Sequence, residues 1–373
     1  MDVSPLNYKL TFEPDLKKFT FAGLESISIN CKKSVNAITM NCAELKIKSC
    51  IVTSGKKIIK SYPKTNEKKE ELQIKLAEKI RGLCTIDLEF EGILNDRLLG
   101  FYRSRYEQNG KTKYLATTQF EAADARRAFP CWDEPEAKAT FEISIIADNQ
   151  FTAISNMPVK TKKKTGKTTL YNFQKTPLVS TYLIYLGVGE FEYLSGKAGK
   201  IQIRVVTTKG NTSKGKFSLE LGKKLLTSYE KYFGIKFPLP KLDLIAVPDF
   251  AAGAMENWGA ITFRETILLY DPKTSSTRTK QFIAEVISHE IAHMWFGNLV
   301  TMKWWNDLWL NESFATFMAT KFVDKFYPEW DLWNQFVEDA MNVAMGLDSL
   351  KTTHPIDVKV NSPAEIREIF DAI

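Results

Sequence analysis

The segment VISHEIAHMWFGN, residues 286–298, holds two of the three histidines in the 373-residue chain. His289 and His293 are four positions apart, and Glu290 directly follows the first of them. On an α-helix, positions i and i+4 lie on the same face, about 6 Å apart along the axis. The apolar residues around them predict that this face is shielded from water. The two imidazoles are therefore expected to point at one partly dry place.

The pattern H-E-x-x-H is typical of a zinc site, because two imidazoles at this spacing supply two neighbouring ligands of a tetrahedral ion. Glu290 is one step round the helix, badly placed as a ligand but close enough to touch a metal-bound water. Two core histidines without a metal are the alternative, and the scarcity of histidine in this chain argues against it. We predict one Zn²⁺ per chain, with His289 and His293 as ligands.

A third ligand is expected from Glu312, 19 residues after His293 in WLNESFATF. This position falls in the first turns of the next predicted helix, which could pack antiparallel to the first. Three protein ligands leave one position for water, which is the mark of a catalytic zinc site. Zinc lowers the pKa of that water, and Glu290 as general base can pass its proton to a leaving amine. The predicted reaction is hydrolysis of an amide or related acyl bond.

The first half of the chain alternates apolar and polar residues with a period of two. This alternation predicts antiparallel sheets with one face exposed to water, in a β-rich domain over residues 1–190. The segments that show it best are NYKLTF (7–12), LESISIN (24–30), CTIDLEF (84–90), TFEISII (140–146) and TTLYNFQ (168–174).

The second half changes to a helical period. Phe217, Leu221, Leu225 and Tyr229 recur every four residues, which predicts a helix over 214–234. The remaining predicted elements are strands at 242–250 and 259–270 and helices at 279–296 and 307–326. The expected fold class is therefore multi-domain α+β, with a mixed α/β domain over residues 191–373 that carries the chemistry.

Charge and composition exclude several other classes. The net charge of +7 is spread out, and its densest run, VKTKKKTGKTTL (159–170), has Thr165-Gly166 at its centre, as an exposed hairpin tip would. No nucleic-acid signature accompanies it. No apolar run of 18 residues predicts a membrane span, and the first residues do not resemble a secretory signal. The five cysteines include no C-x-x-C pair, so we expect reduced thiols in a cytoplasmic protein.

Little else in the sequence competes with the zinc site. The third histidine, His354, lies in a polar loop, where a surface position is expected. A Ser-His-Asp or Cys-His hydrolase would need it as a base. The tryptophan cluster is expected to pack in the core around the site helices and consists of Trp295, Trp304, Trp305 and Trp309.

Several motifs together resemble the gluzincin aminopeptidases of the M1 family, and the resemblance covers nearly the whole chain. The pattern H-E-x-x-H, with a Glu after eighteen further residues, follows the motif GAMEN at 253–257. The other similar segments are QFEAADARRAFPCWDEPEAKATF (119–141), STYLIYLGVGEF (180–191) and WWNDLWLNESFATF (304–317). The cytosolic branch, with the puromycin-sensitive and archaeal tricorn-interacting enzymes, is the most similar. The resemblance implies a saddle-like β domain followed by a thermolysin-like catalytic domain.

The resemblance also implies how a peptide with a free N-terminus is bound. In the family, the Glu of GAMEN binds the terminal amine, a role that falls to Glu256 here. A second acidic contact falls to Glu121, with Gln119 beside it. Two carboxylates at one ammonium give charge-assisted hydrogen bonds and exclude substrates without the amine. The backbone expected to pair with the substrate as an edge strand does is that of Gly253, Ala254 and Met255.

One departure leaves an alternative open. In the family, the segment matching EIREIFDAI (365–373) runs on into Ser-Tyr, and that tyrosine stabilises the oxyanion; this sequence ends at Ile373. Loss of one oxyanion donor commonly costs about 10² to 10³ in kcat. The alternative is therefore a truncated, catalytically weak or silent zinc-containing fragment that binds peptides or a partner. A leukotriene-hydrolase-like enzyme is a weaker alternative, because the Ala of GAMEN favours the plain aminopeptidases. Neither the preferred N-terminal residue nor the oligomeric state follows from the sequence.

Overall fold

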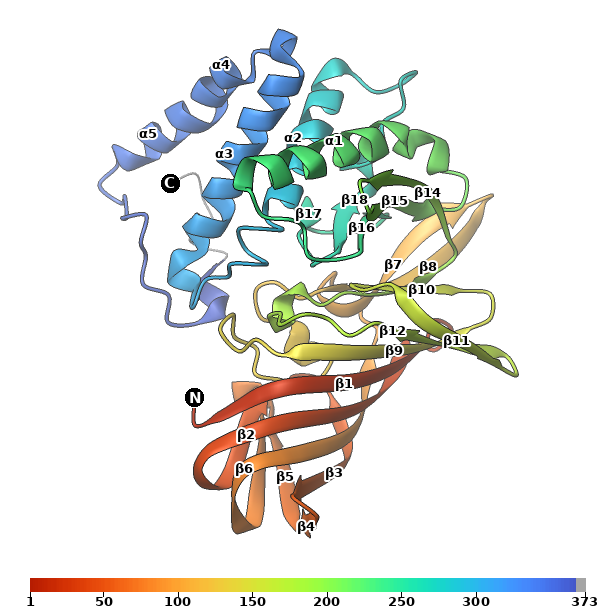
Figure 1. The fold of residues 1–373 in the computed structure, drawn as a ribbon, viewed down its shortest axis with the longest axis vertical. Helices are drawn as coiled ribbons and strands as arrows, with labels where there is room; N and C mark the ends of the chain where they lie inside the picture. The colour runs from red at the N-terminus through yellow and green to blue at the C-terminus, as the bar shows by residue number, and fades with distance from the viewer. Residues whose placement is uncertain (367–373) are drawn as a thin grey trace. The chain divides into compact units, whose positions relative to one another are not determined.

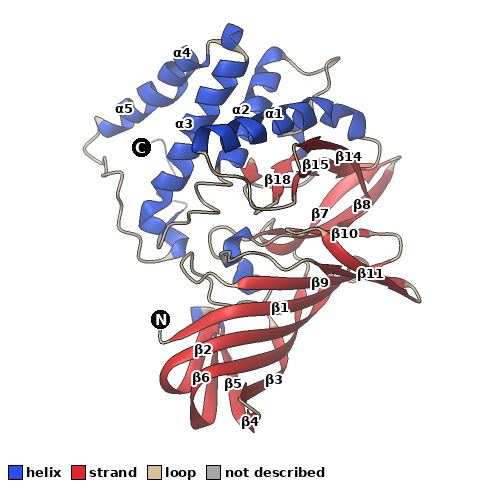
Figure 2. Ribbon diagram, viewed as in Figure 1, coloured by secondary structure: helices blue, strands red, loops and turns tan. Residues whose placement is uncertain are grey.

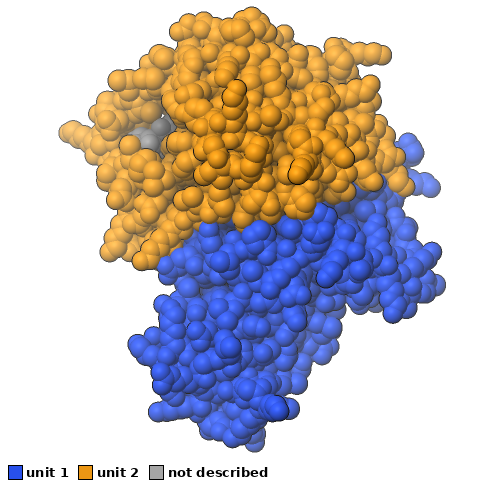
Figure 3. Space-filling model, in the orientation of Figure 1, with its two compact units in different colours: residues 1–191, 247–251 blue, residues 192–246, 252–373 orange. Residues whose placement is uncertain are grey.

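The computed structural model describes residues 1–366. The chain forms two compact units: unit 1 comprises Met1–Phe191 with Val247–Ala251, and unit 2 comprises Glu192–Ala246 with Ala252–Ile373 (Figure 3). Unit 1 consists almost wholly of strands, whereas unit 2 combines strands with α-helices (Figure 2). The predicted fold class, a β-rich part followed by a mixed α/β part, is confirmed.

Two sheets build unit 1. Their strands are β1 (Val3–Asp15), β2 (Thr20–Asn41), β3 (Lys46–Ser54), β4 (Lys57–Ile59), β5 (Ser61–Asn66), β6 (Glu71–Ile93), β7 (Gly100–Gln108), β8 (Lys111–Gln119), β9 (Thr140–Asp148), β10 (Thr152–Ser155), β11 (Val159–Thr165), β12 (Thr168–Phe173) and β13 (Leu186–Gly189). The larger sheet has nine strands in the order β11-β12-β9-β1-β2-β6-β3-β4, and β5 pairs with β6 (Figure 1). The smaller sheet has the order β10-β13-β8-β7.

The five segments predicted as strands form parts of strands of the larger sheet, because their alternation places every second side chain in the core; only Gln174, at the end of the last segment, lies beyond its strand. The predicted hairpin tip is also confirmed: β11 and β12 pair up to Thr165 and Thr168, and Gly166 between them has φ +59°. The prediction of antiparallel pairing is wrong at one place, since β1 and β9 run parallel. Alternation determines the face of each side chain but not the direction of the neighbouring strand.

The core of unit 1 contains the acidic side chain of Glu25 on β2. It is 3% exposed, and neither carboxylate oxygen has a hydrogen-bond partner among residues 1–366. Burial raises the pKa of the Glu25 carboxyl well above its ordinary value. The pKa of Glu25 in the folded protein exceeds its pKa in the unfolded chain, which is about 4.3. The destabilising effect of Glu25 is therefore smallest below about pH 4.3. The free energy of unfolding falls as the pH rises from there toward the folded-state pKa.

Replacing Glu25 with Leu is therefore expected to stabilise unit 1 at pH 7.5, by about 1 to 3 kcal/mol, because a buried polar group without a partner is removed. The gain should shrink at pH 5, because the free-energy cost of burying Glu25 falls as the pH falls. Urea unfolding of both proteins at the two pH values measures it. Glu89→Leu, at an exposed position of β6, is the matched control and should change stability little. A Glu25→Leu protein less stable than the parent at both pH values would contradict this account.

Unit 2 contains a five-stranded sheet and the α-helices. The strands, in the order β14-β15-β16-β18-β17, are β14 (Phe191–Ala198), β15 (Ile201–Thr208), β16 (Lys241–Val247), β18 (Ala260–Arg264) and β17 (Ala254–Met255). The helices are α1 (Lys216–Phe233), α2 (Thr277–Ala292), α3 (Leu308–Phe326), α4 (Leu332–Phe336) and α5 (Asn342–Asp348). In the part of the chain that the structure describes, no helix is long and apolar enough to cross a membrane.

The helix predicted over 214–234 is confirmed as α1. Its repeat buries Leu221, Leu225 and Tyr229, while Phe217 at its start is half-buried. Gly234 ends the helix with φ 67°, a left-handed conformation that favours glycine. Three predicted boundaries are wrong in unit 2. The strand expected over 242–250 ends at Val247. The strand expected over 259–270 ends at Arg264, where a 3-10 helix begins.

The helix expected to reach residue 296 also ends early, because α2 stops at Ala292 and the chain turns before Gly297. Gly297 has φ +124°, which a residue with a side chain rarely adopts. The predicted helix over 307–326 is confirmed as α3, which packs against α2. This pair of helices carries the predicted metal ligands.

The tryptophan cluster is only partly a core feature. Trp295 and Trp305 are buried, and Trp304 is half-buried with its indole N–H donating to the carbonyl of Val360 at 2.7 Å. Trp309 is 39% exposed, so the prediction of core packing is wrong for it.

Candidate metal centre

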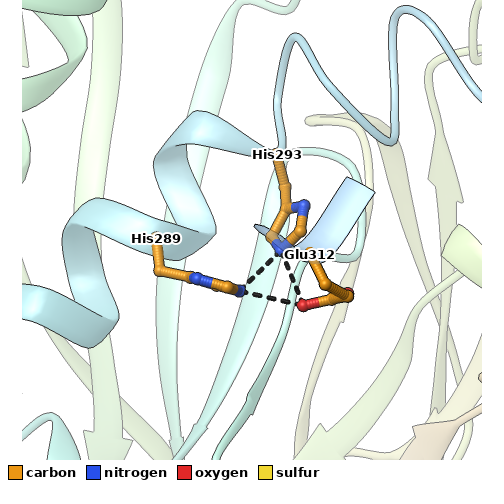
Figure 4. A group of neighbouring side chains, drawn as sticks. All are labelled: His289, His293 and Glu312. Carbon is orange, nitrogen blue, oxygen red and sulfur yellow. Dashed lines mark hydrogen bonds and ion pairs between the residues drawn. The ribbon is translucent and has the colours of Figure 1, made fainter. Parts of the chain in front are cut away.

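Two helix ends bring the three predicted ligands together. His289 lies in the last turn of α2, His293 caps the end of that helix, and Glu312 lies near the start of α3. His289 Nε2 is 3.1 Å from Glu312 Oε2, and His293 Nε2 is 3.6 Å from the same oxygen. The two Nε2 atoms are 2.8 Å apart, and Figure 4 shows all three side chains converging on one point.

The tautomer of His293 fits a metal ligand. Its Nδ1 faces two acceptors, the carbonyl oxygen of Phe296 at 3.0 Å and Oδ1 of Asn311 at 2.7 Å. A nitrogen between two acceptors carries the hydrogen, so Nε2 presents its lone pair to the centre. Two imidazole nitrogens and one carboxylate oxygen are a donor set that Zn²⁺ prefers. The residues present therefore fit a zinc ion.

Electrostatics couple the three side chains. Burial alone would raise the pKa of Glu312, but His293 and His289 beside it lower that pKa well below its ordinary range. For His293 the balance is reversed: burial alone would lower its pKa, and the carboxylates of Glu256 and Glu312 raise it well above its usual range. The centre therefore favours positive charge at the point where the imidazoles and the carboxylate meet.

Glu290 places a carboxylate beside this centre. It is 5% exposed, and its Oε2 finds no hydrogen-bond partner among the described residues. Burial raises the pKa of Glu290 well above its ordinary value, and the neighbouring carboxylates of Glu256 and Glu312 add to the shift. A carboxylate with a raised pKa is better able to hold a proton near neutral pH, as a general base must.

Glu256 approaches the same place from the sheet. It directly follows β17, the edge strand, and its carboxylate lies within 4.8 Å of ligand atoms of Glu290 and His293. Two amides hold it: Asn298 Nδ2 donates to its backbone carbonyl at 2.8 Å, and Asn311 Nδ2 donates to its Oε1 at 3.2 Å. A buried acidic side chain is thus fixed beside the centre.

The backbone of 253–255 has the edge position that the sequence predicted for substrate pairing. Ala254 and Met255 pair with Phe263 and Thr262 on one side, and the sheet order ends with this strand. Next to them, the Gly253 carbonyl accepts a hydrogen bond from the Arg264 N–H at 2.9 Å. The edge of a sheet is the position from which a strand can pair with an extended peptide.

The other two predicted substrate residues belong to unit 1. Gln119 is the last residue of β8, Glu121 follows two positions later, and both are half-buried. The structure thus brings together five of the predicted side chains within unit 2, namely His289, His293, Glu312, Glu290 and Glu256. The part that Gln119 and Glu121 take in the site stays a prediction.

Sequence reasoning missed three polar residues around the ligands. Asn311 and Asn298 bond as described above, and Thr316 Oγ1 lies 3.2 Å from His289 Nδ1. The only signal in the sequence was position, since Asn311 directly precedes Glu312 and Thr316 follows it by one helical turn. The third histidine is not part of the centre: His354 is half-buried in a loop, with Nδ1 at 3.0 Å from the Pro355 carbonyl oxygen.

A β-rich part followed by an α/β part with the H-E-x-x-H and Glu constellation is an arrangement typical of H-E-x-x-H peptidases. Comparison with family models specifies it further. The Peptidase M1 N-terminal domain matches residues 4–183, and the Peptidase family M1 domain matches residues 217–373. The chain belongs to peptidase family M1, as the resemblance of its motifs predicted.

Curated relatives align with essentially the whole chain. Aminopeptidase M1 of Arabidopsis thaliana is 45% identical over 376 residues, covering 99% of this chain and 43% of the relative. Aminopeptidase 2, mitochondrial, of Saccharomyces cerevisiae is 45% identical over 382 residues, which are 100% of this chain and 40% of the relative. The puromycin-sensitive aminopeptidase of Caenorhabditis elegans is 44% identical over 380 residues, which are 99% of this chain and 40% of the relative. The chain spans less than half the length of these relatives.

Proposed function

We propose that the protein is a cytoplasmic zinc-dependent aminopeptidase that removes N-terminal residues from peptides. The observation that carries this proposal is the convergence of two imidazole nitrogens and the Glu312 carboxylate beside the buried carboxylates of Glu290 and Glu256. The printed names of the curated relatives, which are aminopeptidases, support the reaction class. We assign a β-rich domain to residues 1–190 and the catalytic domain to residues 191–373.

In this proposal, His289, His293 and Glu312 hold one Zn²⁺. When bound, the ion supplies a water of lowered pKa and polarises the carbonyl of the scissile bond. Glu290 accepts the proton of the attacking water on its carboxylate and delivers it to the leaving amine. Its burial and its neighbouring carboxylates support this role, because both raise its pKa toward the range in which a proton is taken up and released.

The proposal assigns recognition of the free N-terminus to acidic side chains. Glu256, with Glu121 and Gln119 from the first unit, binds the terminal ammonium by charge-assisted hydrogen bonds. The backbone of Gly253, Ala254 and Met255 pairs with the peptide as an edge strand. The burial of Glu256 and its fixed position beside Glu290 support its part, because a desolvated carboxylate binds an ammonium more strongly than an exposed one.

Digestion of a peptide tests the proposed function directly. A decapeptide with a free N-terminus is incubated with the zinc-loaded chain, and the products are followed by mass spectrometry. Stepwise loss of residues from the N-terminus is expected, with no loss from the N-acetylated decapeptide. Cleavage at internal bonds, or equal cleavage of both peptides, would contradict an aminopeptidase.

Replacing Glu256 with Gln is expected to lower kcat/KM for free-amine aminoacyl anilides about 30- to 100-fold. The change keeps the shape of the side chain but removes the charge in a hydrogen bond to the ammonium, which is worth about 2 to 3 kcal/mol. Most of the effect should fall on KM. Glu220→Gln, on the exposed face of α1, is the matched control. An unchanged kcat/KM in Glu256→Gln would rule out Glu256 as the amine-binding residue.

A further inference from the structure

Asn311 has a position that the proposed reaction does not yet explain. It lies on α3 directly before Glu312, and it is 3% exposed. Its two amide atoms bond in opposite directions: Oδ1 accepts from Nδ1 of His293 at 2.7 Å, and Nδ2 donates to Oε1 of Glu256 at 3.2 Å. Nδ2 is also 3.5 Å from Oε1 of Glu312. One amide therefore joins a metal ligand to the proposed amine-binding carboxylate.

The neighbours of this amide fix its orientation. Ionised carboxylates only accept hydrogen bonds, so Nδ2 must be the atom that faces Glu256 and Glu312. Oδ1 then faces His293, whose Nδ1 must be the donor. The opposite orientation would set an amide oxygen against carboxylate oxygens and an amide hydrogen against the N–H of the imidazole. The Asn311 amide thus selects the tautomer in which His293 Nε2 is free to bind a metal.

The backbone beside Asn311 leaves room for this amide and little more. A Cβ atom on Gly297 would lie 2.3 Å from Asn311 Oδ1 and 3.3 Å from His293 Nδ1. The turn after α2 can therefore pass this close only because residue 297 is a glycine. Both residues of the His293–Asn311 bond are also buried, with 1% and 3% of their surface exposed.

We infer that Asn311 is a positioning residue that holds His293 in its metal-binding tautomer and, with the same amide, holds Glu256 for the substrate amine. The role of Asn311 at His293 is called the metal half of this inference, and its role at Glu256 the Glu256 half. The metal half rests on hydrogen bonds alone. The Glu256 half rests on the proposed function. The inference predicts that the two halves can be separated by substitution, because each half uses a different atom of the side chain.

Two substitutions at residue 311 test it. Asn311→Ala removes both bonds and is expected to weaken zinc binding about 10- to 100-fold, as the loss of the partner of a ligating histidine typically does. Asn311→Asp keeps an oxygen for His293 Nδ1 but sets a carboxylate against Glu256. It should restore zinc affinity to within about threefold of the parent, a rescue that a loss of packing would not show. Zinc affinity is measured by competition with a chelator of known affinity.

Amine recognition is measured on the same proteins at saturating zinc, by calorimetry with leucine hydroxamate and N-acetyl-leucine hydroxamate. The ratio of the two dissociation constants cancels the contribution of the metal. Asn311→Asp is expected to lower this preference for the free amine at least about tenfold, because like charges repel at Glu256. Asn342→Ala, an exposed asparagine on α5, is the matched control and should change neither value.

Each outcome decides one part of the inference. Zinc affinity of Asn311→Ala within threefold of the parent would overturn the metal half. A preference for the free amine that persists unchanged in Asn311→Asp would overturn the Glu256 half. If the parent itself shows no such preference, the proposed function fails together with the Glu256 half, while the zinc affinity of Asn311→Ala still decides the metal half.

Discussion

Replacing Glu290 with Gln is expected to lower kcat about 10²- to 10⁴-fold while one zinc per chain stays bound. The amide has nearly the shape of the carboxylate but cannot accept the proton of the attacking water, and general-base catalysis contributes about this factor. The ligands His289, His293 and Glu312 are unchanged, so metal affinity should remain. Steady-state hydrolysis of an aminoacyl anilide and metal analysis of the same sample give both quantities.

The control for this prediction lies on the same helix. Glu285 is half-buried on α2, five positions before Glu290 and one turn before the ligand His289, and burial raises the pKa of its carboxyl too. Glu285→Gln should leave kcat within about threefold, because no step is assigned to this side chain. Turnover by Glu290→Gln within tenfold of the parent would remove Glu290 as the general base.

Replacing His293 with Ala is expected to abolish stoichiometric zinc binding, with an affinity loss of at least about 10³-fold. Loss of the hydrogen-bonding partner of a ligand costs 10- to 100-fold, and loss of the ligand itself must cost more. Turnover should disappear with the metal. Equilibrium dialysis against buffered zinc measures the affinity, and His354→Ala, which changes the histidine in the loop, should bind zinc as the parent does.

The same substitution should destabilise the metal-free protein at neutral pH by about 3 to 5 kcal/mol, because it leaves buried carboxylates without their partner. His293 and His289 hold the pKa of Glu312 below its ordinary value. Stability from this pairing is thus present above the unfolded pKa of about 4.3 and is lost as the pH falls toward the folded-state pKa. The raised pKa of His293 makes its own contribution nearly constant below about pH 6, so urea unfolding at pH 6 and at pH 3 should show a smaller deficit at the lower pH. An equal deficit at both would contradict the pairing.

The periodicity of the sequence predicted most of the elements that carry the centre. The four-residue spacing of His289 and His293 needs only helical geometry, and the period of α3 places Glu312 near its start. Periodicity does not determine where an element ends. The end of α2 at Ala292 depends on the turn to Gly297, and the end of β18 at Arg264 depends on a local 3-10 helix.

Contacts between distant segments were the part that the sequence could not predict. The amide of Asn311 bonds to residues 18 and 55 positions away, and no pattern of residue types specifies such partners. The parallel pairing of β1 with β9 likewise depends on which strands meet and not on their alternation. The sequence predicted a departure from the family at EIREIFDAI (365–373). Residues 367–373 of this segment lie outside the described residues.

The central claim is that this chain is a zinc aminopeptidase built on His289, His293 and Glu312. The most direct test measures zinc per chain and hydrolysis of leucine anilide on one sample, with N-acetyl-leucine anilide as the control. The account predicts one zinc per chain and hydrolysis of the free-amine substrate alone, lost with a chelator and restored by one equivalent of zinc. One bound zinc without turnover would contradict the enzyme and favour a zinc-containing peptide-binding protein, and absence of bound zinc would contradict the metal centre itself.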